Sequence, residues 1–479
     1  MSQYHTNRIR SAELLATLPT EWPTSLLPEI QSRIQSSGQS IVVLDDDPTG
    51  TQTVYDVPVL TEWSVATLQA ELARATPLFY VLTNSRSLPA AAASALNIEI
   101  AENLLAASQA TERPFSVVSR SDSTLRGHYP GEVDALLSAL GYSVDAQLII
   151  PYFLEGGRLT INDVHYVAET IEDEAWLVPA SETPFAQDAV FGYTNANLCA
   201  WVEEKTNGAV SASDVASITL TDIRQGGPEH VAQKLQGLNG GMVCIINAVT
   251  LRDLEVVVQG ILDAEASSTR FIYRTAASFV QIRAGLAPRP LLTASDLGLS
   301  TDGSGPGGLV VVGSYVPKTT AQLNALLAED IMTDLEVNVQ LLLDDASQAE
   351  EITRVVTAAD RALAAGEDVV VYTSRELVRR DDANENLQVG QRISDSLVEI
   401  VRRLQTQPRY LIAKGGITSS DTATKALGIQ RAMVMGQIYP GIPLWQAGEE
   451  SRFPGVPYVV FPGNVGGDGA LDNTKILTT

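Results

Sequence analysis

The sequence predicts an α/β protein with two domains, each a mainly parallel sheet flanked by helices, and with an N-terminal helical arm. Short β-branched runs alternate with Ala- and Leu-rich stretches of helical period along most of the chain, which is typical of βαβ units. The small, polar and Gly-rich segment 293–308 interrupts this pattern once, and such a composition suits a linker. A chain of 479 residues also exceeds what one compact core usually supports.

In chain order, we expect the helical arm over residues 1–38, a first domain over 39–292, the linker over 293–308 and a second domain over 309–479. Strands of the first domain are expected at residues 40–45, 77–83, 115–120, 146–152, 241–247 and 270–275. Strands of the second domain are expected at residues 309–312, 368–374, 409–414 and 458–461. The 87–108 segment between two of these strands is a clear example of a helical stretch.

The composition excludes several functional classes. A formal net charge of −25 argues against sequence-independent binding of nucleic acid and against docking to anionic membranes. The two cysteines, Cys199 and Cys244, have no CxxC partner, so we expect reduced, buried thiols. No stretch resembles a signal peptide or a membrane span, which predicts a soluble, cytoplasmic protein.

Polar side chains follow three strands of the first domain. The first strand ends in three aspartates, Asp45 to Asp47, and the next two are followed by Asn84-Ser85-Arg86 and by a run from Ser121 to Gly127. Ligands of parallel sheets bind beyond the carboxyl ends of the strands, and carboxylates with arginines suit a small polyhydroxy acid. Asp45 has a second interpretation, as the cap of a following helix.

A further segment of the first domain, residues 151–167, offers Arg158, Thr160, Asn162 and His165. His165 has two interpretations: a general base, or a hydrogen-bonded structural residue, which is commoner for a lone histidine near apolar residues.

Glycine-rich turns follow three strands of the second domain. They are Gly313-Ser314, Gly415-Gly416 and the 463–469 segment, which carries four glycines in seven residues. Glycine lets backbone N–H groups approach a phosphate, so three such turns predict a nucleotide site. The GxxxxGK[ST] loop is absent, and the GSGPGG run at residues 303–308 precedes its strand, which excludes a dinucleotide fingerprint.

Taken in order, these motifs resemble the four-carbon acid sugar kinase family over about residues 40–470. The matching elements are DDxTG (Asp46, Asp47, Thr49, Gly50), NSR (Asn84 to Arg86), K-x-DSTxRG (Arg120 to Gly127), GR-T-x-N-x-x-HYV (from Gly157), VVGS with T-x-x-Q (Gly313, Ser314, Thr319, Gln322), GGxTS (Gly415, Gly416, Thr418, Ser419), PG-P (Gly441, Pro443) and GNxGG (from Gly463). The chain departs from the family pattern at three places: it has a third aspartate with Pro48 in the first motif, Arg120 in place of Lys, and Ile417 where many members carry Glu.

The resemblance implies an N-terminal domain that binds an acid sugar and a C-terminal domain that binds ATP with Mg²⁺, without a dedicated protein metal site. It implies phosphorylation of threonate, erythronate or 3-oxo-tetronate in carbohydrate catabolism. The implied catalytic residues are Asp46, Asp47 and Asp122. The expected substrate-binding residues are Asn84, Ser85, Arg86, Arg120, Ser123, Thr124, Arg126, Gly127 and Arg158. We expect Arg86 and Arg126 to hold the carboxylate of the sugar, with the alternative that either one faces the γ-phosphate of ATP. The implied nucleotide-binding residues are Gly313, Ser314, Gly415, Gly416, Ile417, Thr418, Gly463, Asn464, Gly466 and Gly467.

Two other functions remain open from the sequence. The chain can be a non-catalytic acid-sugar-binding or effector-type interaction protein, or an ATP-dependent enzyme for another small carboxylate. A homodimer is plausible, and the arm can pack on its own domain or on a partner subunit. The sequence selects neither the particular acid sugar nor the aspartate that acts as the base.

Overall fold

The computed structural model describes residues 7–299, 305–329, 331–375, 383–463 and 465–471, without the side chains of residues 383–387. It divides into two compact units. Unit 1 comprises residues up to Thr53 together with Glu62–Pro288, and unit 2 comprises Val54–Thr61 and the chain from Arg289. The expected domains, 39–292 and 309–479, differ from these units in the placement of residues 54–61 and 289–292. Residues 300–304 of the expected linker lie outside the described residues.

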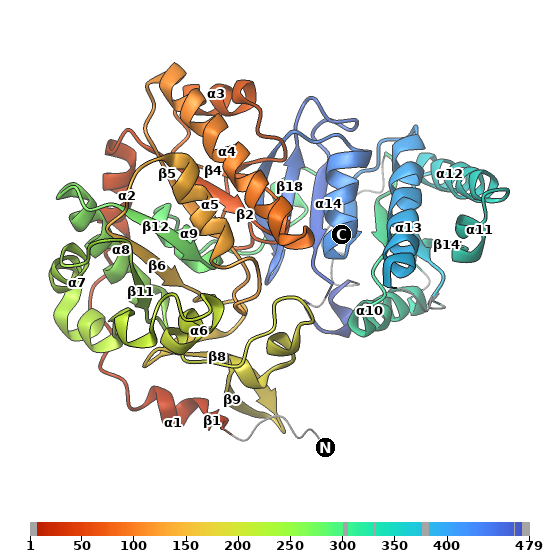
Figure 1. Cartoon of the computed structure of the whole chain (residues 1–479). Coiled ribbons are helices and arrows are strands. Elements are labelled where there is room, and N and C mark those ends of the chain that lie inside the picture. Colours follow the sequence, from red (N-terminus) through yellow and green to blue (C-terminus); the bar gives the residue numbers. More distant parts are fainter. Residues whose placement is uncertain (1–6, 300–304, 330, 376–382, 464, 472–479) are drawn as a thin grey trace. The chain divides into compact units, whose positions relative to one another are not determined.

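The main sheet of unit 1 is fully parallel, in the order β10-β11-β6-β12-β5-β2-β4 (Figure 1). Its strands are β2 (Ser40–Asp45), β4 (Leu78–Leu82), β5 (Phe115–Arg120), β6 (Ala146–Ile150), β10 (Ala216–Ile218), β11 (Met242–Ile246) and β12 (Phe271–Thr275). Its helices are α1 (Ser11–Leu15), α2 (Leu27–Ser36), α3 (Val65–Ala73), α4 (Ala90–Thr111), α5 (Gly131–Leu140), α6 (Leu198–Lys205), α7 (Gly227–Gln236), α8 (Leu251–Ala266) and α9 (Ala277–Arg283). Helices α4 and α5 pack against each other, and so do α7 and α8.

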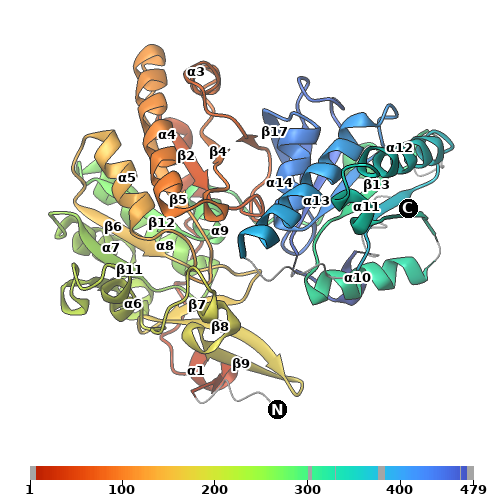
Figure 2. The same ribbon diagram turned by 45° about the vertical axis from the view of Figure 1, so that its right-hand side comes forward.

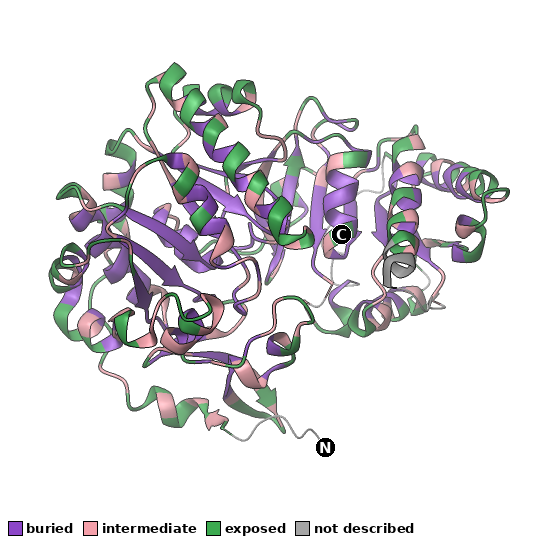
Figure 3. Cartoon of the chain, in the orientation of Figure 1, coloured by how far each residue is buried: buried purple, intermediate pink, exposed green. Residues whose placement is uncertain are grey.

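The strands of this sheet are buried, whereas the outer faces of the covering helices are exposed (Figure 3). All six residues of β2 are buried, as expected for a parallel strand with helices on both faces. The register places the ends of three neighbouring strands together, because Asp45 lies opposite both Leu82 and Arg120. The polar segments that follow β2, β4 and β5 therefore begin at one edge of the sheet.

Unit 1 also contains a second, antiparallel sheet that the sequence did not lead us to expect (Figure 2). Its order is β1-β9-β8-β7, formed by β1 (Ile9–Arg10), β7 (Arg158–Ile161), β8 (Val164–Ile171) and β9 (Glu174–Pro179). Both stretches of the arm that were expected to be helical contain a helix, α1 and α2, whereas β1, which pairs with β9, was not expected. This short strand offered little pattern, since two residues cannot establish a period.

The arm packs on its own unit. Glu255 of α8 accepts hydrogen bonds from the Ser25 hydroxyl at 2.8 Å and from the Leu26 N–H at 2.7 Å. It thereby supplies a carboxylate beside the first turn of α2, where unpaired N–H groups favour negative charge. Further along α2, Arg33 forms an ion pair with Asp263 of α8.

Unit 2 has a mixed sheet in the order β3-β17-β18-β19-β16-β13-β15-β14. Its strands are β3 (Val57–Leu60), β13 (Leu309–Val312), β14 (Thr333–Val337), β15 (Val369–Thr373), β16 (Leu411–Lys414), β17 (Arg431–Tyr439), β18 (Ile442–Ala447) and β19 (Pro457–Phe461). Its helices are α10 (Pro317–Ala328), α11 (Val339–Leu343), α12 (Gln348–Ala364), α13 (Ala383–Arg403) and α14 (Gly416–Asp421).

Five strands of unit 2, from β19 to β14, are parallel, whereas β18, β17 and β3 extend the sheet in antiparallel fashion. The register aligns Val312 with Lys414, and Lys414 with Phe461. The three glycine turns therefore start at the carboxyl ends of neighbouring parallel strands β13, β16 and β19. Within the described residues, no helix is long and apolar enough to cross a membrane.

Candidate active site

Asp45 is the last residue of β2, and its side chain accepts hydrogen bonds from two protein groups. Its Oδ1 accepts a hydrogen bond from Arg120 Nη1 at 2.9 Å and one from the Asp47 N–H at 3.3 Å. Burial raises its pKa to about 6, although the Arg120 guanidinium opposes the increase. A Cβ at Gly50 would lie 2.0 Å from Asp45 Oδ2, so only glycine lets the chain fold back over this carboxylate. The segment after Asp45 is a series of turns, so this residue does not cap a helix.

Asp46 is a buried carboxyl group, and only 3% of its surface is exposed. Among the described residues, no group donates a hydrogen bond to either of its side-chain oxygens. Arg120 Nη1 lies 3.6 Å from Asp46 Oδ1. Burial raises the pKa of Asp46 to about 7 against the attraction of Arg86 and Arg120. A carboxyl group with a pKa near neutrality can both accept and release a proton at physiological pH.

Gly127 brings the backbone close to Asp46. Its φ is +119°, and a Cβ there would lie 3.2 Å from Asp46 Oδ2 and 3.0 Å from Arg274 Nη2. Such a φ favours glycine. The segment that follows β5 therefore comes close to the carboxyl group of Asp46 at Gly127.

Asp47 and Asp122 are held in ion pairs by two arginines. Arg86 forms ion pairs with Asp47 and, at 3.4 Å, with Asp122 Oδ1. Arg126 Nε donates to Asp122 Oδ2 at 2.7 Å. Burial alone would raise the pKa of each aspartate, but the guanidinium groups and hydroxyls of Thr49 and Thr124 hold both pKa values below the usual range. These two carboxylates are consequently weaker proton acceptors than Asp46.

Two other predicted residues at this edge of the sheet, Asn84 and Ser85, form hydrogen bonds with neighbouring protein groups. Asn84 adopts φ +50°, and its N–H donates to Asp45 O at 3.3 Å. Ser85 is buried and donates to Glu132, which also forms an ion pair with Arg274 at 3.8 Å. Neither Glu132 nor Arg274 was among the site residues predicted from the sequence. Arg274 carried a usable signal, since it lies one residue before the end of a predicted strand.

His165 has the structural role. It is fully buried; its Nε2 lies 2.7 Å from the Ser123 carbonyl oxygen, and its Nδ1 lies 3.0 Å from Thr160 Oγ1. Burial lowers its pKa to about 4. The ring therefore ties β8 and β7 to the motif that follows β5, and nothing assigns it a proton-transfer role. The hydroxyl of Thr124 is directed at Asp122.

Three glycine turns of unit 2 converge. A Cβ at Gly313 would lie 2.5 Å from Thr418 Oγ1, and a Cβ at Gly415 would lie 2.9 Å from Ser314 Cβ. Gly415 also has φ +118°. A Cβ at Gly463 would lie 3.5 Å from Ser314 Oγ. These distances place Ser314 between the other two turns.

Helix α10 fixes the third turn. Thr319 Oγ1 donates to the Gly463 carbonyl at 2.9 Å, and Gln322 Nε2 donates to the carbonyls of Val465 and Gly467, both at 2.9 Å. A Cβ at Gly466 would lie 2.4 Å from Ala470 Cβ, so this residue is needed for packing. By contrast, Cβ atoms at Gly416 and Gly467 would meet no atom within 4 Å. The neighbouring Ile417 is 64% exposed, and Asn464 lies outside the described residues.

Two cations beside these turns were missed by the sequence analysis. Lys414 ends β16 and is fully buried; its Nζ donates to the Pro462 carbonyl at 2.5 Å and lies 3.9 Å from the Phe461 ring centroid. Burial, reinforced by Lys318, lowers its pKa to about 7. Arg375 follows β15 and donates to Ser314 O at 2.6 Å. The sequence signal available for these two residues was their position, since Lys414 is the last residue of β16 and Arg375 follows β15.

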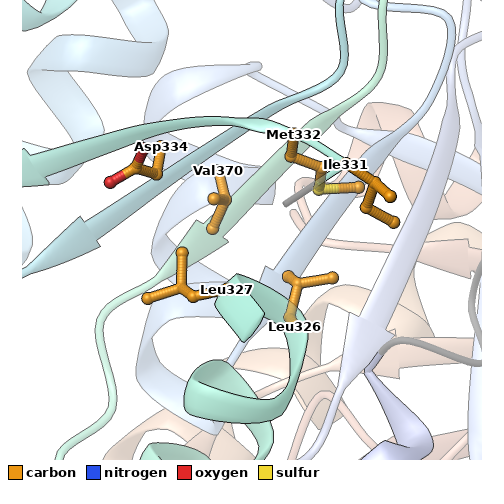
Figure 4. Close-up of a pocket in the computed structure, with 6 residues that line it drawn as sticks. All are labelled: Leu326, Leu327, Ile331, Met332, Asp334 and Val370. Atoms are coloured by element: carbon orange, nitrogen blue, oxygen red, sulfur yellow. The ribbon is translucent and has the colours of Figure 1, made fainter. Parts of the chain in front are cut away.

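The glycine turns fit a nucleotide, because their backbones approach one another where side chains would collide. Among the described residues, no group of three or more His, Cys, Asp or Glu side chains is arranged to hold a metal ion. A hollow of about 120 Å³ elsewhere in unit 2 is lined mainly by apolar residues (Figure 4). It lies beside Asp334 and Val370, near the amino ends of β14 and β15, and therefore at the opposite end of the sheet from the glycine turns.

Two family profiles match the chain. One is described as a sugar-binding N-terminal domain and matches residues 41–283; the other is described as a nucleotide-binding C-terminal domain and matches residues 309–471. The chain belongs to the four-carbon acid sugar kinase family.

Three curated relatives are named as kinases. The chain is similar to a 3-oxo-isoapionate kinase of Paraburkholderia graminis, with 29% identity over 46% of this chain and 52% of the relative. A D-erythronate kinase of Heliobacterium modesticaldum is 28% identical over 51% and 50%, respectively. A 3-oxo-tetronate kinase of Pseudomonas savastanoi is 26% identical over 82% and 85%. The matches thus span about half the length of the first two relatives.

Solved structures support the fold. A Salmonella typhimurium LT2 protein, provisionally described as a tRNA synthase, has a TM-score of 0.66 and 18% identity, covering 91% of this chain and 98% of its own. A Haemophilus influenzae protein has a TM-score of 0.61 and 19% identity, covering 91% and 100%. At such identities the likeness concerns the fold alone.

Proposed function

We propose that this protein is an ATP-dependent kinase that phosphorylates a hydroxyl group of a small sugar acid, with a four-carbon acid such as threonate, erythronate or 3-oxo-tetronate as the substrate. The observation that carries the proposal is Asp46. It is a desolvated carboxyl group with a raised pKa, surrounded by paired arginines, in the unit that matches a sugar-binding profile. The kinase names of the relatives support the same reaction class.

Asp46 accepts the proton of the attacking hydroxyl in this proposal. The hydroxyl oxygen forms a bond to the terminal phosphorus of ATP, the bond from that phosphorus to the bridging oxygen breaks, and ADP leaves. Magnesium bound with the nucleotide supplies neutralisation of phosphate charge. Since phosphoryl transfer depends chiefly on positioning and charge, the ion pairs of Arg86 with Asp47 and Asp122 serve to hold the strand-end motifs rigidly.

The nucleotide is assigned to unit 2. Backbone N–H groups of the turns at Gly313, Gly415 and Gly463 approach the phosphates, and Ser314 and Thr418 add hydroxyl groups. Lys414 donates to Pro462 at the base of the third turn, and its amine, with a pKa of about 7, is charged in part of the molecules near neutral pH. An open position such as Gly416 leaves room that a larger side chain would fill.

ADP release tests the proposal. The protein is incubated with Mg²⁺ and ATP against D- and L-threonate, D- and L-erythronate, their 3-oxo forms and longer aldonates. Turnover of one compound supports the kinase function and identifies the substrate. No turnover, with ATP still binding in calorimetry, refutes the four-carbon substrate and favours an enzyme for another small carboxylate. No turnover and no ATP binding favours the non-catalytic binding protein.

Two variants separate the ligands. Asp46→Asn is expected to lower turnover by about 10²- to 10⁴-fold while leaving ATP binding intact. Gly416→Val is expected to weaken ATP binding and to leave sugar-acid binding nearly unchanged. Loss of sugar-acid binding alone in Gly416→Val would contradict the assignment of the nucleotide to unit 2.

A further inference from the structure

Arg158 differs in charge pairing from the other arginines around the strand ends of unit 1. Arg86, Arg120, Arg126 and Arg274 each form an ion pair with at least one carboxylate. Within the described part of the chain, Arg158 forms no ion pair and its side chain donates no hydrogen bond to a protein group, and its Nε is buried without a partner. An arginine left unpaired in a chain with a net charge of −25 requires a specific explanation.

The side chain of Arg158 lies beside the candidate active site. Its guanidinium Cζ is 5.4 Å from the ring centroid of Phe185, and the Cζ of Arg126 is 5.2 Å from the same centroid. Arg126 in turn donates to Asp122 at 2.7 Å. The guanidinium groups of Arg126 and Arg158 thus both approach the ring of Phe185.

The surroundings of Arg158 leave its guanidinium partly accessible. The residue begins β7 and is half-buried. A Cβ at Gly156 would lie 2.9 Å from Arg158 Nη1, so glycine at that position gives the guanidinium its room. Asp122 and Glu169 contribute negative charge from a distance, whereas Arg126 contributes positive charge. The guanidinium group of Arg158 therefore carries N–H donors for which the described part of the chain provides no acceptor.

We propose that Arg158 is the receptor for the carboxylate of the substrate, and that Phe185 holds its guanidinium flat for this contact. This inference rests on the proposed function and specifies the group that selects an acid over a neutral polyol. Guanidinium groups bind carboxylates through paired N–H donors, and this geometry is specific to arginine. Arg86 and Arg126, which were expected from the sequence to have this role, already bind Asp47, Asp122 and Asp188. A substrate carboxylate would have to compete with those groups.

Steady-state kinetics test the assignment. With the acid identified by the ADP-release panel, or D-erythronate by default, Arg158→Gln is expected to raise the KM for the acid about a hundredfold, as removal of one partner of a close charge pair does. The kcat and the KM for ATP are expected to change by less than about threefold, because other residues hold the reacting groups. Arg158→Lys keeps the charge and loses the fork, so an intermediate increase of about tenfold is expected.

Erythritol, a four-carbon polyol without a carboxylate, provides the specific readout. Wild type and Arg158→Gln are expected to use it equally poorly, whereas a general structural defect would reduce turnover of both compounds. Arg10→Gln is the matched control: Arg10 also lies over an aromatic ring of the same antiparallel sheet, at 5.6 Å from the Trp176 centroid, and it pairs with Glu174 at 3.1 Å. Its KM for the acid is expected to stay unchanged.

Each outcome of these experiments supports or overturns the assignment of Arg158 as the carboxylate receptor. An unchanged KM for the acid in Arg158→Gln, or a loss of kcat without a rise in KM, overturns the assignment while leaving the kinase function standing. If the wild type turns over no acid, calorimetry with D-erythronate separates the two proposals. Binding that Arg158→Gln abolishes sustains the carboxylate receptor without the kinase function, and no binding by the wild type overturns both.

Discussion

Replacing Asp46 by Asn removes the proposed proton acceptor while keeping the size of the side chain. Loss of a general base typically costs about 10²- to 10⁴-fold in turnover, and we expect Asp46→Asn to fall in this range. The pKa of about 7 for Asp46 also defines the pH dependence of the wild type. The ionised fraction is about one tenth at pH 6 and about nine tenths at pH 8, so kcat/KM should rise about tenfold between these values and then level off.

The assay is ADP release at saturating Mg²⁺ and ATP, with kcat/KM for the acid measured from pH 5.5 to 8.5. Glu265→Gln serves as a control, because Glu265 is an acid of unit 1 that pairs with Arg283 at 2.8 Å outside the candidate site. Its pH profile should keep the wild-type shape. A wild-type profile that is flat across this range, or an Asp46→Asn variant that retains more than about a tenth of the activity, would refute the role of Asp46.

The pH dependence of the free energy of unfolding provides an independent test of the pKa of Asp46. Because the folded state raises the pKa of Asp46 from 3.8 to about 7, it binds the proton more tightly than the unfolded state does. The contribution of Asp46 to stability is therefore fully present below pH 4 and is lost as the pH rises through 7, by up to about 4 kcal/mol. Asp46→Asn should consequently melt higher than wild type at pH 8, with a smaller difference at pH 5, in thermal unfolding experiments.

Three further predictions concern residues around the turns and strands. Gly415→Ala should strain the backbone by about 1–3 kcal/mol at φ +118° and press on Ser314, which calorimetry should detect as weaker ATP binding. Lys414→Met removes a buried amine with a pKa of about 7 and its bond to Pro462; we expect a higher KM for ATP without a lower melting temperature. His165→Phe leaves two buried polar groups unpaired and should cost about 1–3 kcal/mol in unfolding free energy, with the pH profile of kcat/KM unchanged.

Most parallel strands were predictable because buried strands produce continuous apolar runs, whereas the partly exposed parallel strands β10 and β14 were missed. Each of the ten expected strands is present, and the motif after Asp45 lies at the aligned ends of β2, β4 and β5. The antiparallel strands were harder to recognise. In β8 the burial changes from buried to mostly exposed along the strand, and in β17 it alternates, so neither produces a simple apolar run. Residues 54–61 join unit 2 through pairing of β3 with β17, about 370 residues later, and local sequence carries no signal of that pairing.

The three aspartates also show why residue type alone does not assign chemistry. Asp45, Asp46 and Asp47 are consecutive and chemically identical, yet Asp45 is bound by Arg120 and Asp47 is bound by Arg86, whereas Asp46 has no hydrogen-bond partner in the part of the chain that the structure describes. Their pKa values diverge because each side chain meets different neighbours after folding.

The paired and unpaired charges suggest how one strand edge can bind an acid and still activate its hydroxyl. A substrate carboxylate needs a cation, whereas a general base loses its proton affinity beside one. At Asp46 burial outweighs the cations beside it, so its pKa stays raised although Arg120 lies 3.6 Å away. Two other arginines of the strand ends, Arg86 and Arg126, are neutralised by internal aspartates. This pairing limits the positive charge that reaches Asp46 and leaves Arg158 as an unpaired cation for the substrate. On this reasoning, Asp122→Asn should lower the apparent pKa of kcat/KM, because Arg86 would keep its ion pair with Asp47 but lose the one with Asp122, and would then stabilise the ionised form of Asp46 more strongly.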